Sequence, residues 1–260
     1  MKRLKYLASA LAVASAMTSV SYAAGGTAHN WYVKRENGEP VCPPEMSFIE
    51  DHDCRFIDTV AASSGDRVVY LTFDAGYENG NVAKVLDTLK EENVPGAFFI
   101  LENLAKREPD LLKRMTDEGH TVCNHTAKHR DMTTCGDFPE FRAELEKMEN
   151  EYERATGKTL SKYYRPPEGR FSEENLCFAD QLGYKTVLWS FAYADWDNDR
   201  QPDPKTSREK IVSSVCPGAV LLLHPMSETN AEILGDVIRT LKREGYRFGT
   251  LDELFGDEKA

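Results

Sequence analysis

The stretch from residue 68 to residue 100, VVYLTFDAGYENGNVAKVLDTLKEENVPGAFFI, decides the fold. Residues 68–73 form an almost unbroken apolar run, which is typical of a strand that is buried on both faces. Apolar residues then recur at helical spacing over 81–92, and Pro95 ends that pattern. A second apolar run follows at 96–101. A strand, a helix and another buried strand in succession predict a βαβ unit in a parallel sheet.

The same alternation continues along the chain, so we predict an α/β fold, a (β/α) barrel with parallel strands. About seven such units favour a closed or nearly closed barrel over an open sheet. The further strands are expected at 121–123, 163–164, 184–191, 218–223 and 246–251, and the further helices at 109–118, 139–155, 173–182, 207–215 and 231–244.

The N-terminus has the pattern of an export signal. Lys2, Arg3 and Lys5 precede an Ala-rich apolar stretch at 6–20, and small residues lead up to Ala23. The stretch is short for a bilayer span, so cleavage is favoured over a membrane anchor, and no later segment is long and apolar enough to span a membrane. We therefore expect a signal peptide at 1–23 and a mature protein that is secreted or associated with the cell envelope.

The remaining chain predicts one domain with a short extension. Residues 24–65 are polar, with several prolines and glycines, and are expected to wrap on the domain as an N-terminal extension. The alternating pattern fills 66–255, which leaves 256–260 as a C-terminal tail. No linker separates a second core, and we expect a monomer.

The composition is acidic. The formal net charge is −11, and removal of the three cations of the signal, with no acid among them, takes it to −14. Nucleic acid is therefore excluded as a partner, because binding to phosphates requires clustered positive charge.

All six cysteines lie beyond the signal. An even number of cysteines in an oxidising compartment predicts disulfides. A cysteine-rich metal site is disfavoured because no C-x-x-C spacing occurs. Nearness in sequence favours the pairs Cys42–Cys54 and Cys123–Cys135, which leaves Cys177–Cys216.

Polar side chains recur at the ends of the predicted strands. The carboxyl ends of parallel barrel strands lie at one end of the barrel, where catalytic groups gather. Five such positions together indicate a single active site. These residues are Asp74, His125, Arg165, Asp195 and His224, which follow the first, third, fourth, fifth and sixth strands.

His125 and His129 are four residues apart, so both imidazoles can reach one metal ion. The spacing alone also suits surface or core histidines, but the position after a strand favours ligation. His120 is interpreted as a residue at the start of a strand. Asp131 is a further possible ligand.

Asp74 could be a helix cap, a metal ligand or a general base. Arg165 is followed by a rigid Pro-Pro pair that could hold it against the carboxylate of Asp74 and so keep this base ionised. A surface role for Arg165 remains open. His224 is a candidate general acid, because an imidazole beside Asp195 can stay protonated near neutral pH. Trp196 could pack in the core or stack on a sugar ring.

Five motifs appear in an order and spacing that resemble the NodB-homology polysaccharide deacetylases, carbohydrate esterase family four. The resemblance covers roughly 66–255 and implies a distorted (β/α) barrel that removes acetyl groups from amino sugars of chitin or peptidoglycan, or from xylan, with a divalent metal. The motifs are Thr72-Phe73-Asp74, His125-x-x-x-His129, Arg165-Pro166-Pro167-x-Gly169, Asp195-Trp196 and Leu222-x-His224.

The resemblance also implies a role for each matched residue. Asp74 would be the base that activates water and Arg165 would position it, while Asp195 would tune His224, the acid that protonates the leaving amine. Leu222 would line the pocket for the acetyl methyl group. The backbone N–H of Glu168 would help the metal to hold the oxyanion. The metal ligands would be His125 and His129, with zinc the favoured ion.

Two positions depart from the family pattern. Ala75 stands where most members have a second Asp that binds the metal, and Ala192 stands where many have an extra Asp. The loss of a carboxylate predicts weaker metal binding. The surrounding residues are similar to the branch of peptidoglycan N-acetylmuramic acid deacetylases of spore-forming bacteria, which also lacks the second Asp.

We therefore expect a secreted enzyme that de-N-acetylates muramic acid in peptidoglycan glycan strands, as a step toward muramic δ-lactam in spore cortex. One alternative keeps the mechanism but places the reaction on N-acetylglucosamine of peptidoglycan or chitin. A second alternative is a cell-wall-binding protein with a degenerate site, since Ala75 replaces a ligand. Retention of a general base at Asp74 argues against it.

Overall fold

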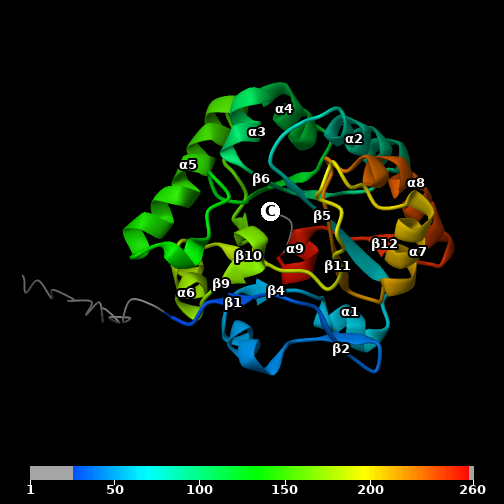
Figure 1. Ribbon diagram of the computed structural model, residues 1–260, viewed down its shortest axis with the longest axis horizontal. Helices are drawn as coiled ribbons and strands as arrows, with labels where there is room; N and C mark the ends of the chain where they lie inside the picture. Colours follow the sequence, from blue (N-terminus) through cyan, green and yellow to red (C-terminus); the bar gives the residue numbers. More distant parts are fainter. Residues whose placement is uncertain (1–25, 258–260) are drawn as a thin grey trace, which may run out of the picture.

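The computed structural model describes residues 26–257, and its centre is a sheet of short parallel strands with helices packed around the outside (Figure 1). The predicted distorted (β/α) barrel is confirmed. In spatial order the strands are β11 (Ala219–Leu223), β5 (Val68–Ala75), β6 (Ala97–Ile100), β7 (Thr121–Asn124), β8 (Tyr163–Tyr164), β10 (Lys185–Val187) and β4 (Cys54–Arg55), and β12 (Arg247–Phe248) also pairs with β5.

The longer helices connect the strands and cover the outer face of the sheet (Figure 1). Side-chain caps begin many of them; Asp137, for example, accepts a hydrogen bond from the Glu140 N–H. The helices are α1 (Thr59–Ser64), α2 (Asn81–Glu92), α3 (Glu102–Arg107), α4 (Pro109–Asp117), α5 (Phe138–Thr156), α6 (Glu173–Gln181), α7 (Pro204–Ser214), α8 (Glu228–Arg243) and α9 (Leu251–Phe255), and the 3₁₀ segments are η1 (Pro44–Asp51), η2 (Met132–Thr134) and η3 (Pro167–Gly169).

The alternation of side chains along β5 decides which groups enter the barrel. Val68 and Tyr70 lie in the apolar cluster that fills the barrel interior together with Leu251 of α9. The intervening residues, which include Phe73 and Ala75, lie in the larger cluster between the sheet and its outer helices. Because successive side chains of a strand point to opposite faces, Asp74 shares the inner face with Tyr70. Ala75, fully buried, belongs to the outer, apolar layer.

Part of the N-terminal extension belongs to the barrel itself. β4 pairs in parallel with β10, and Ile57 forms an antiparallel bridge to Ala219 at the start of β11. The Asp58 N–H also donates to the Gly218 carbonyl at 2.9 Å. Residues 54–58 therefore connect the last strand of the sheet to the first, and they close the barrel. The domain boundary at residue 65 stays a prediction, but residues before it complete the sheet.

Before β4, the chain forms two further strand pairs on the outside of the barrel. β2 (Lys34–Glu36) and β3 (Glu39–Val41) form a hairpin, and β1 (His29–Asn30) pairs antiparallel with β9 (Arg170–Phe171). In Figure 1 this blue segment runs along one side of the barrel, beside β4 and β9. Residues 29–41 thus lie along the outside of the barrel.

The main helices lie close to the predicted positions, and the prediction of a helix at 81–92 is confirmed by α2. The strand expected at 184–191 is much shorter. β10 ends at Val187, although Phe191 still forms a bridge to Leu221. The strand expected at 246–251 is also shortened, because Leu251 turns into α9 and packs inside the barrel.

The predicted disulfides are wrong, because all six cysteines are free thiols in the structure. Cys123 lies on β7 in the cluster inside the barrel, whereas Cys135 packs in a separate cluster near η2. Cys42 and Cys54 do share one cluster, but Cys42 directs its thiol to the carbonyls of Pro43 and Met46. Burial raises the pKa of the Cys42 thiol to about 11, which keeps it protonated.

The predicted signal peptide at 1–23 lies outside the described residues, and so does most of the predicted C-terminal tail. Between residues 26 and 257, no helix has the length and apolar character needed to cross a membrane.

Candidate active site

A buried ion pair forms the base of the site. Arg165 is fully buried directly after β8, and its Nη1 donates to Asp74 Oδ1 at 2.7 Å. The other guanidinium nitrogens bond the Val187 carbonyl at 2.9 Å and the Thr72 hydroxyl at 2.8 Å. The guanidinium also lies 4.1 Å from the centre of the Phe99 ring. A fully hydrogen-bonded arginine is held rigidly, so it fixes one oxygen of Asp74 and leaves Oδ2 directed toward the pocket.

The charge of Asp74 follows from these neighbours. Burial acts to raise its pKa, but Arg165, His125 and His224 together hold the pKa of this carboxyl below its usual value. Asp74 is therefore an ionised carboxylate at neutral pH. One oxygen is engaged by Arg165, and Oδ2 lies 3.4 Å from Nε2 of His125.

His125, directly after β7, presents a lone pair to the site. Its Nδ1–H donates to the Arg165 carbonyl at 2.9 Å, so Nε2 is unprotonated when the ring is neutral. Burial lowers the pKa of His125 to about 4, which keeps the ring neutral. The His129 ring lies 5.0 Å away, centre to centre, and His129 itself is exposed. Thr126 and His129 both have positive φ, at 72° and 55°, so this loop is held in an uncommon backbone conformation.

The two imidazoles fit a divalent ion only in part. Nε2 of His125 has the free lone pair and the fixed second nitrogen that a metal-binding histidine requires. Between residues 26 and 257, however, no group of three or more His, Cys, Asp or Glu side chains is arranged to hold an ion. Asp131 is not available, because its carboxylate bonds Thr133 and Arg170. A metal in this site would be held by His125 and His129, with water completing its coordination.

His224, directly after β11, forms a second charged pair with Asp195. Its Nδ1 lies 2.7 Å from Asp195 Oδ1, and its backbone N–H donates to Oδ2 at 2.9 Å. Burial acts to lower the pKa of His224, but the hydrogen bond and charge of Asp195 raise it above the usual value of 6.5. The pairing with Asp195 thus favours the charged form of the His224 imidazole.

Asn230 completes this pair and was not predicted from the sequence. Its Nδ2 donates to Asp195 Oδ2 at 2.6 Å and to the His224 carbonyl at 3.0 Å, and its Oδ1 accepts from the Tyr193 hydroxyl. Asn230 lies on the first turn of α8, after the capping residue Ser227. The amide holds the carboxylate in the orientation that His224 needs. A cap followed by a buried Asn is a weak signal in a sequence, which is why Asn230 was missed.

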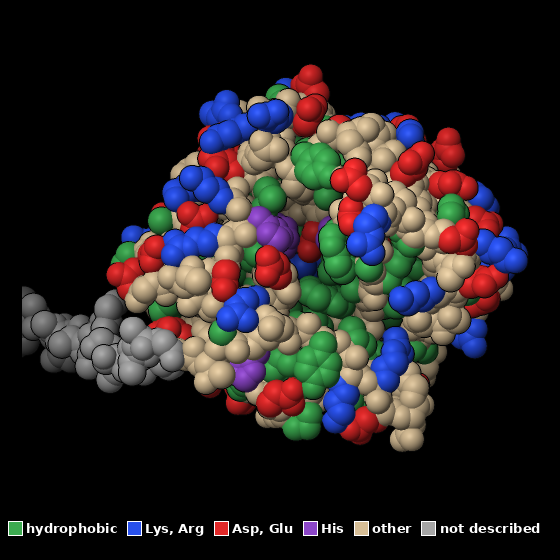
Figure 2. Space-filling model, viewed as in Figure 1, with side chains coloured by type: hydrophobic (Ala, Val, Ile, Leu, Met, Phe, Trp, Pro, Cys, Tyr) green, Lys and Arg blue, Asp and Glu red, His purple; other side chains and the backbone are tan. Residues whose placement is uncertain are grey.

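The two pairs face a common pocket of about 600 Å³ at the carboxyl ends of the strands. Figure 2 shows this end of the molecule as a hollow in which histidine, acidic and hydrophobic side chains meet. Leu222 is buried in the wall, and Trp196 is 60% exposed with its ring 6.0 Å from that of His224. The remaining lining residues are Asp74, His129, Glu168, Gly169, Trp189, Ala192 and Tyr193.

The structure therefore brings the predicted site residues together. The residues that line one pocket are Asp74, His129, Glu168, Trp196, Leu222 and His224. Arg165 and His125 contact Asp74, and Asp195 contacts His224. Glu168 lies on η3 with φ 58°, in the left-handed region, and its side chain is exposed. Trp189 also lines the pocket, although its sequence context favours a core position over stacking on a sugar ring.

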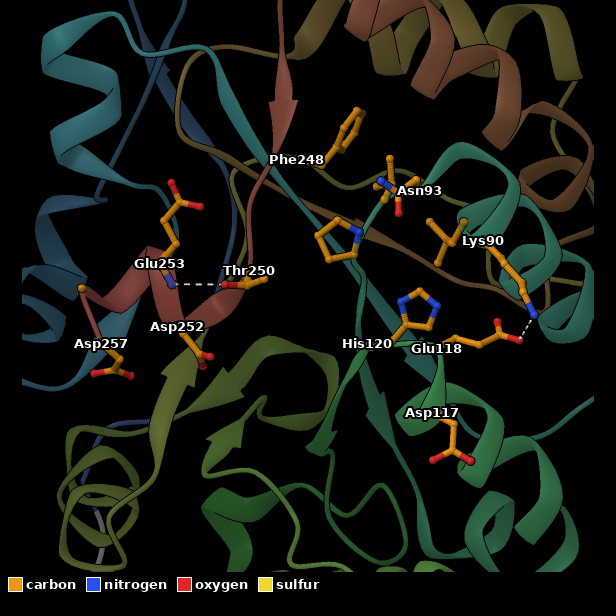
Figure 3. Close-up of a pocket in the computed structure, with 15 residues that line it drawn as sticks. Lys90, Asn93, Asp117, Glu118, His120, Phe248, Thr250, Asp252, Glu253 and Asp257 are labelled. Atoms are coloured by element: carbon orange, nitrogen blue, oxygen red, sulfur yellow. Dashed lines mark hydrogen bonds and ion pairs between the residues drawn. The ribbon is translucent and has the colours of Figure 1, made fainter. Parts of the chain in front are cut away.

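A larger cavity, of about 930 Å³, lies at the opposite end of the barrel (Figure 3). Figure 3 shows Asp252 of α9 and Asp257, just after this helix, on one side and Asp117 and Glu118 on the other. Ion pairs neutralise many of these acids, for example Glu118 with Lys90 at 3.3 Å. The catalytic pairs do not reach this cavity, so the smaller pocket is the candidate active site.

Known proteins resemble this chain over most of its length. A family model described as polysaccharide deacetylase matches residues 61–187. The peptidoglycan-N-acetylmuramic acid deacetylase PdaA of Bacillus subtilis is 40% identical over 235 residues, which cover 88% of this chain and 87% of PdaA. Its solved structure, a family 4 carbohydrate esterase, has a TM-score of 0.82 and covers 88% of this chain and 97% of that chain.

Two more distant relatives differ in activity. A peptidoglycan-N-acetylglucosamine deacetylase of Bacillus cereus is 32% identical over 195 residues, or 74% of this chain and 69% of that protein. BA3943 of Bacillus anthracis, a CE4 family pseudoenzyme, has a TM-score of 0.68 at 28% identity and covers 75% of this chain and 67% of that chain. The extent and identity of the match to PdaA establish that this chain belongs to the polysaccharide deacetylase family, carbohydrate esterase family 4, and is related to enzymes that hydrolyse the amide bond of N-acetyl groups on sugars.

Proposed function

We propose that this chain is an exported, metal-assisted de-N-acetylase of peptidoglycan that acts on N-acetylmuramic acid. One observation carries the proposal: an ionised carboxylate held by Arg165 and a protonated imidazole held by Asp195 face the same pocket. Amide hydrolysis needs a base for the attacking water and an acid for the leaving amine. A protein that only binds the cell wall needs neither, so this arrangement argues against a degenerate site.

The residues of the chain divide the reaction between them. Asp74 takes a proton from the attacking water through Oδ2, while Arg165 keeps the carboxylate ionised and in place. The acetyl methyl packs against Leu222, and the Glu168 backbone N–H is proposed to stabilise the oxyanion. His224 then donates its proton to the amine nitrogen, and Asp195 stabilises the charged imidazole until that step. A divalent ion held by His125 and His129, zinc by the preference of imidazole ligands, would supply polarisation of the carbonyl when bound.

The choice of muramic acid is supported by the relationship to PdaA, which is named for activity on that sugar. The role in muramic δ-lactam formation in spore cortex is part of the same proposal. One observation favours the second candidate, N-acetylglucosamine. Muramic acid that has lost its peptide carries a free lactyl carboxylate, yet no Lys or Arg lines the pocket and Glu168 adds a negative charge at its rim. Nearby Arg170 is already bonded to Asp131 and Asn30.

The test is acetate release from defined, peptide-free glycan oligomers that carry the acetyl group on muramic acid alone or on glucosamine alone. We expect turnover on the muramic oligomer, and loss of turnover with a chelator that zinc restores. Turnover on glucosamine alone would support the second candidate. Measurable glycan affinity without turnover on either oligomer would refute the enzymatic proposal.

Glu168→Gln sharpens the test, because it removes the charge and keeps the size of the side chain. An exposed charge interaction is worth about 0.2–1 kcal/mol, so we expect the ratio of muramic to glucosamine activity to rise by up to about fivefold. Glu173→Gln, an exposed acid on α6, is the matched control and should leave the ratio unchanged.

A further inference from the structure

One buried residue of the extension, Trp31, follows β1 directly and contacts the pocket wall. Trp31 is 5% exposed, although the strand beside it is short and its neighbour Tyr32 is exposed. Its backbone N–H donates to the Gly169 carbonyl at 2.8 Å, and its indole Nε1–H donates to the Trp189 carbonyl at 2.8 Å. Gly169 and Trp189 both line the active-site pocket. One residue of the extension thus holds two separate parts of the pocket wall.

Gly169 is packed closely between Trp31 and Trp189. Gly169 has φ 63°, and a Cβ atom added there would lie 2.5 Å from Cη2 of Trp189 and 3.2 Å from Cβ of Trp31. The three residues are therefore packed against one another with no room for a methyl group. A shift of Trp31 would therefore reach the turn at Gly169, because no gap separates the two residues.

The same wall supports the arginine that holds the base. The Arg165 guanidinium lies 5.7 Å from the centre of the Trp189 ring and donates to the carbonyl of the preceding residue, Leu188, at 3.3 Å. Arg165 in turn holds Asp74. A continuous set of contacts therefore runs from Trp31 through Trp189 and Arg165 to Asp74.

We propose that Trp31 is a positioning residue: it clamps the Gly169 turn and the Trp189 wall so that Arg165 and the Glu168 N–H keep their places for the transition state. The N-terminal extension is then a part of the active-site scaffold. The proposal rests on the proposed hydrolysis for its kinetic readout, but the state of the turn can be measured without any turnover.

The test uses the full chain with Trp31→Phe, which keeps an aromatic ring and loses the indole N–H. We expect kcat/KM for acetate release to fall five- to twentyfold, mainly in kcat, because the affected groups act on the transition state rather than on substrate affinity. Amide hydrogen exchange of Gly169, whose N–H bonds the Pro166 carbonyl at 3.1 Å, should accelerate by a similar factor.

Phe56→Leu is the matched control. The centres of the Phe56 and Trp31 rings lie 5.0 Å apart, and Phe56 packs on the same apolar cluster. Phe56 makes neither of the hydrogen bonds that join Trp31 to Gly169 and Trp189. At equal folded fraction, Phe56→Leu should leave kcat/KM and Gly169 exchange within twofold of wild type. An equal loss in both variants, or wild-type values in Trp31→Phe, would overturn the proposal.

A second variant keeps the proposal testable if Trp31→Phe does not fold. Asn30 is exposed and accepts from Arg170 Nη1 at 3.0 Å across the β1–β9 pair, so Asn30→Ala loosens the same attachment without a core change. A two- to fivefold fall in kcat/KM is expected, and an unchanged value would count against the clamp. If wild type releases no acetate from any glycan, the proposed function fails, while the exchange of Gly169 still decides the role of Trp31.

Discussion

Two buried histidines at the two ends of β7 differ in what they offer their surroundings. His125, at the carboxyl end, donates its Nδ1–H to a carbonyl and turns a lone pair on Nε2 toward Asp74. His120, at the other end, accepts the Gly96 N–H on Nδ1 at 3.2 Å, so its Nε2 carries the proton and finds no partner among residues 26–257. Burial lowers the pKa of both rings.

The comparison shows that residue type and burial do not make a ligand. The hydrogen bond to the second ring nitrogen selects the tautomer, and the tautomer decides whether the first nitrogen can bind a metal. Two acidic residues at the two ends of the barrel also differ in their surroundings. Asp74 is buried and held by a buried arginine, whereas Asp117 at the other end has an exposed side chain paired with exposed Lys158.

The largest expected effect comes from Asp74→Asn. Loss of the general base should lower kcat by roughly 10²- to 10⁴-fold. The thermal midpoint of unfolding should also fall, because the buried Arg165 loses its ion-pair partner, so turnover is compared at equal folded fraction. Asp117→Asn at the opposite end is the matched control and should retain wild-type turnover. Acetate release measures both, and full activity in Asp74→Asn would refute the assigned base.

Ala75→Asp tests the outer face of the same strand. Because Ala75 is fully buried in an apolar cluster, an unpaired carboxylate there should cost about 3 kcal/mol of unfolding free energy without metal. Residue 75 is the last of β5, so zinc should restore part of this loss if the new carboxylate turns at the strand end to an ion held by His125 and His129. Thermal unfolding with and without zinc measures the effect. Ala75→Asn has nearly the same size without the charge, and an equal zinc-dependent gain in that variant would contradict the explanation.

The two histidines can be compared directly by His125→Ala and His120→Ala. Loss of a residue that hydrogen-bonds a metal ligand weakens metal binding by roughly 10- to 100-fold. Removal of the ligand His125 itself should weaken zinc binding by at least this factor. Removal of His120 leaves the Gly96 N–H without its acceptor, so it should lower the unfolding free energy by about 1–3 kcal/mol and leave zinc affinity unchanged. Calorimetric titration and thermal unfolding separate the two; weaker zinc binding in His120→Ala would break the comparison.

The smallest effect is a shift in pH dependence. The proposed mechanism needs Asp74 ionised and His224 protonated. In a plot of activity against pH, the lowered pKa of Asp74 places the acid limb below the usual carboxyl value. The raised pKa of His224 places the alkaline limb above 6.5. Asp195→Asn removes the hydrogen bond to a carboxylate and the charge that do most to raise the pKa of His224, so the alkaline limb should move to lower pH. Asp252→Asn, which loses a bond to Tyr163 at the opposite end, should leave the profile in place. An unmoved alkaline limb in Asp195→Asn would show that another group sets it.

Much of this molecule could be read from local patterns. Apolar runs and helical spacing predict α2 and the order of strands and helices, because each element buries one continuous face. Polar residues after successive strands predict one site, because parallel strands end at the same side of a barrel. Both inferences need only the spacing of residues along the chain.

The disulfide prediction failed because nearness in sequence says nothing about the sheet. Cys123 and Cys135 are close along the chain, but they pack in separate clusters. The length of β10 was overestimated for a related reason, since an apolar run continues past Val187 while the hydrogen bonds move to β11.

The sequence by itself determined the barrel, the positions of Asp74, Arg165, His125, Asp195 and His224 at strand ends, and the family resemblance, because these depend on periodicity and ordered motifs. Only the tertiary structure decided that residues 54–58 close the barrel, that Asn230 orients Asp195, that His125 and His120 differ in tautomer, and that Trp31 holds the pocket wall. These features depend on contacts between residues far apart in the chain, and such contacts leave no regular spacing in the sequence.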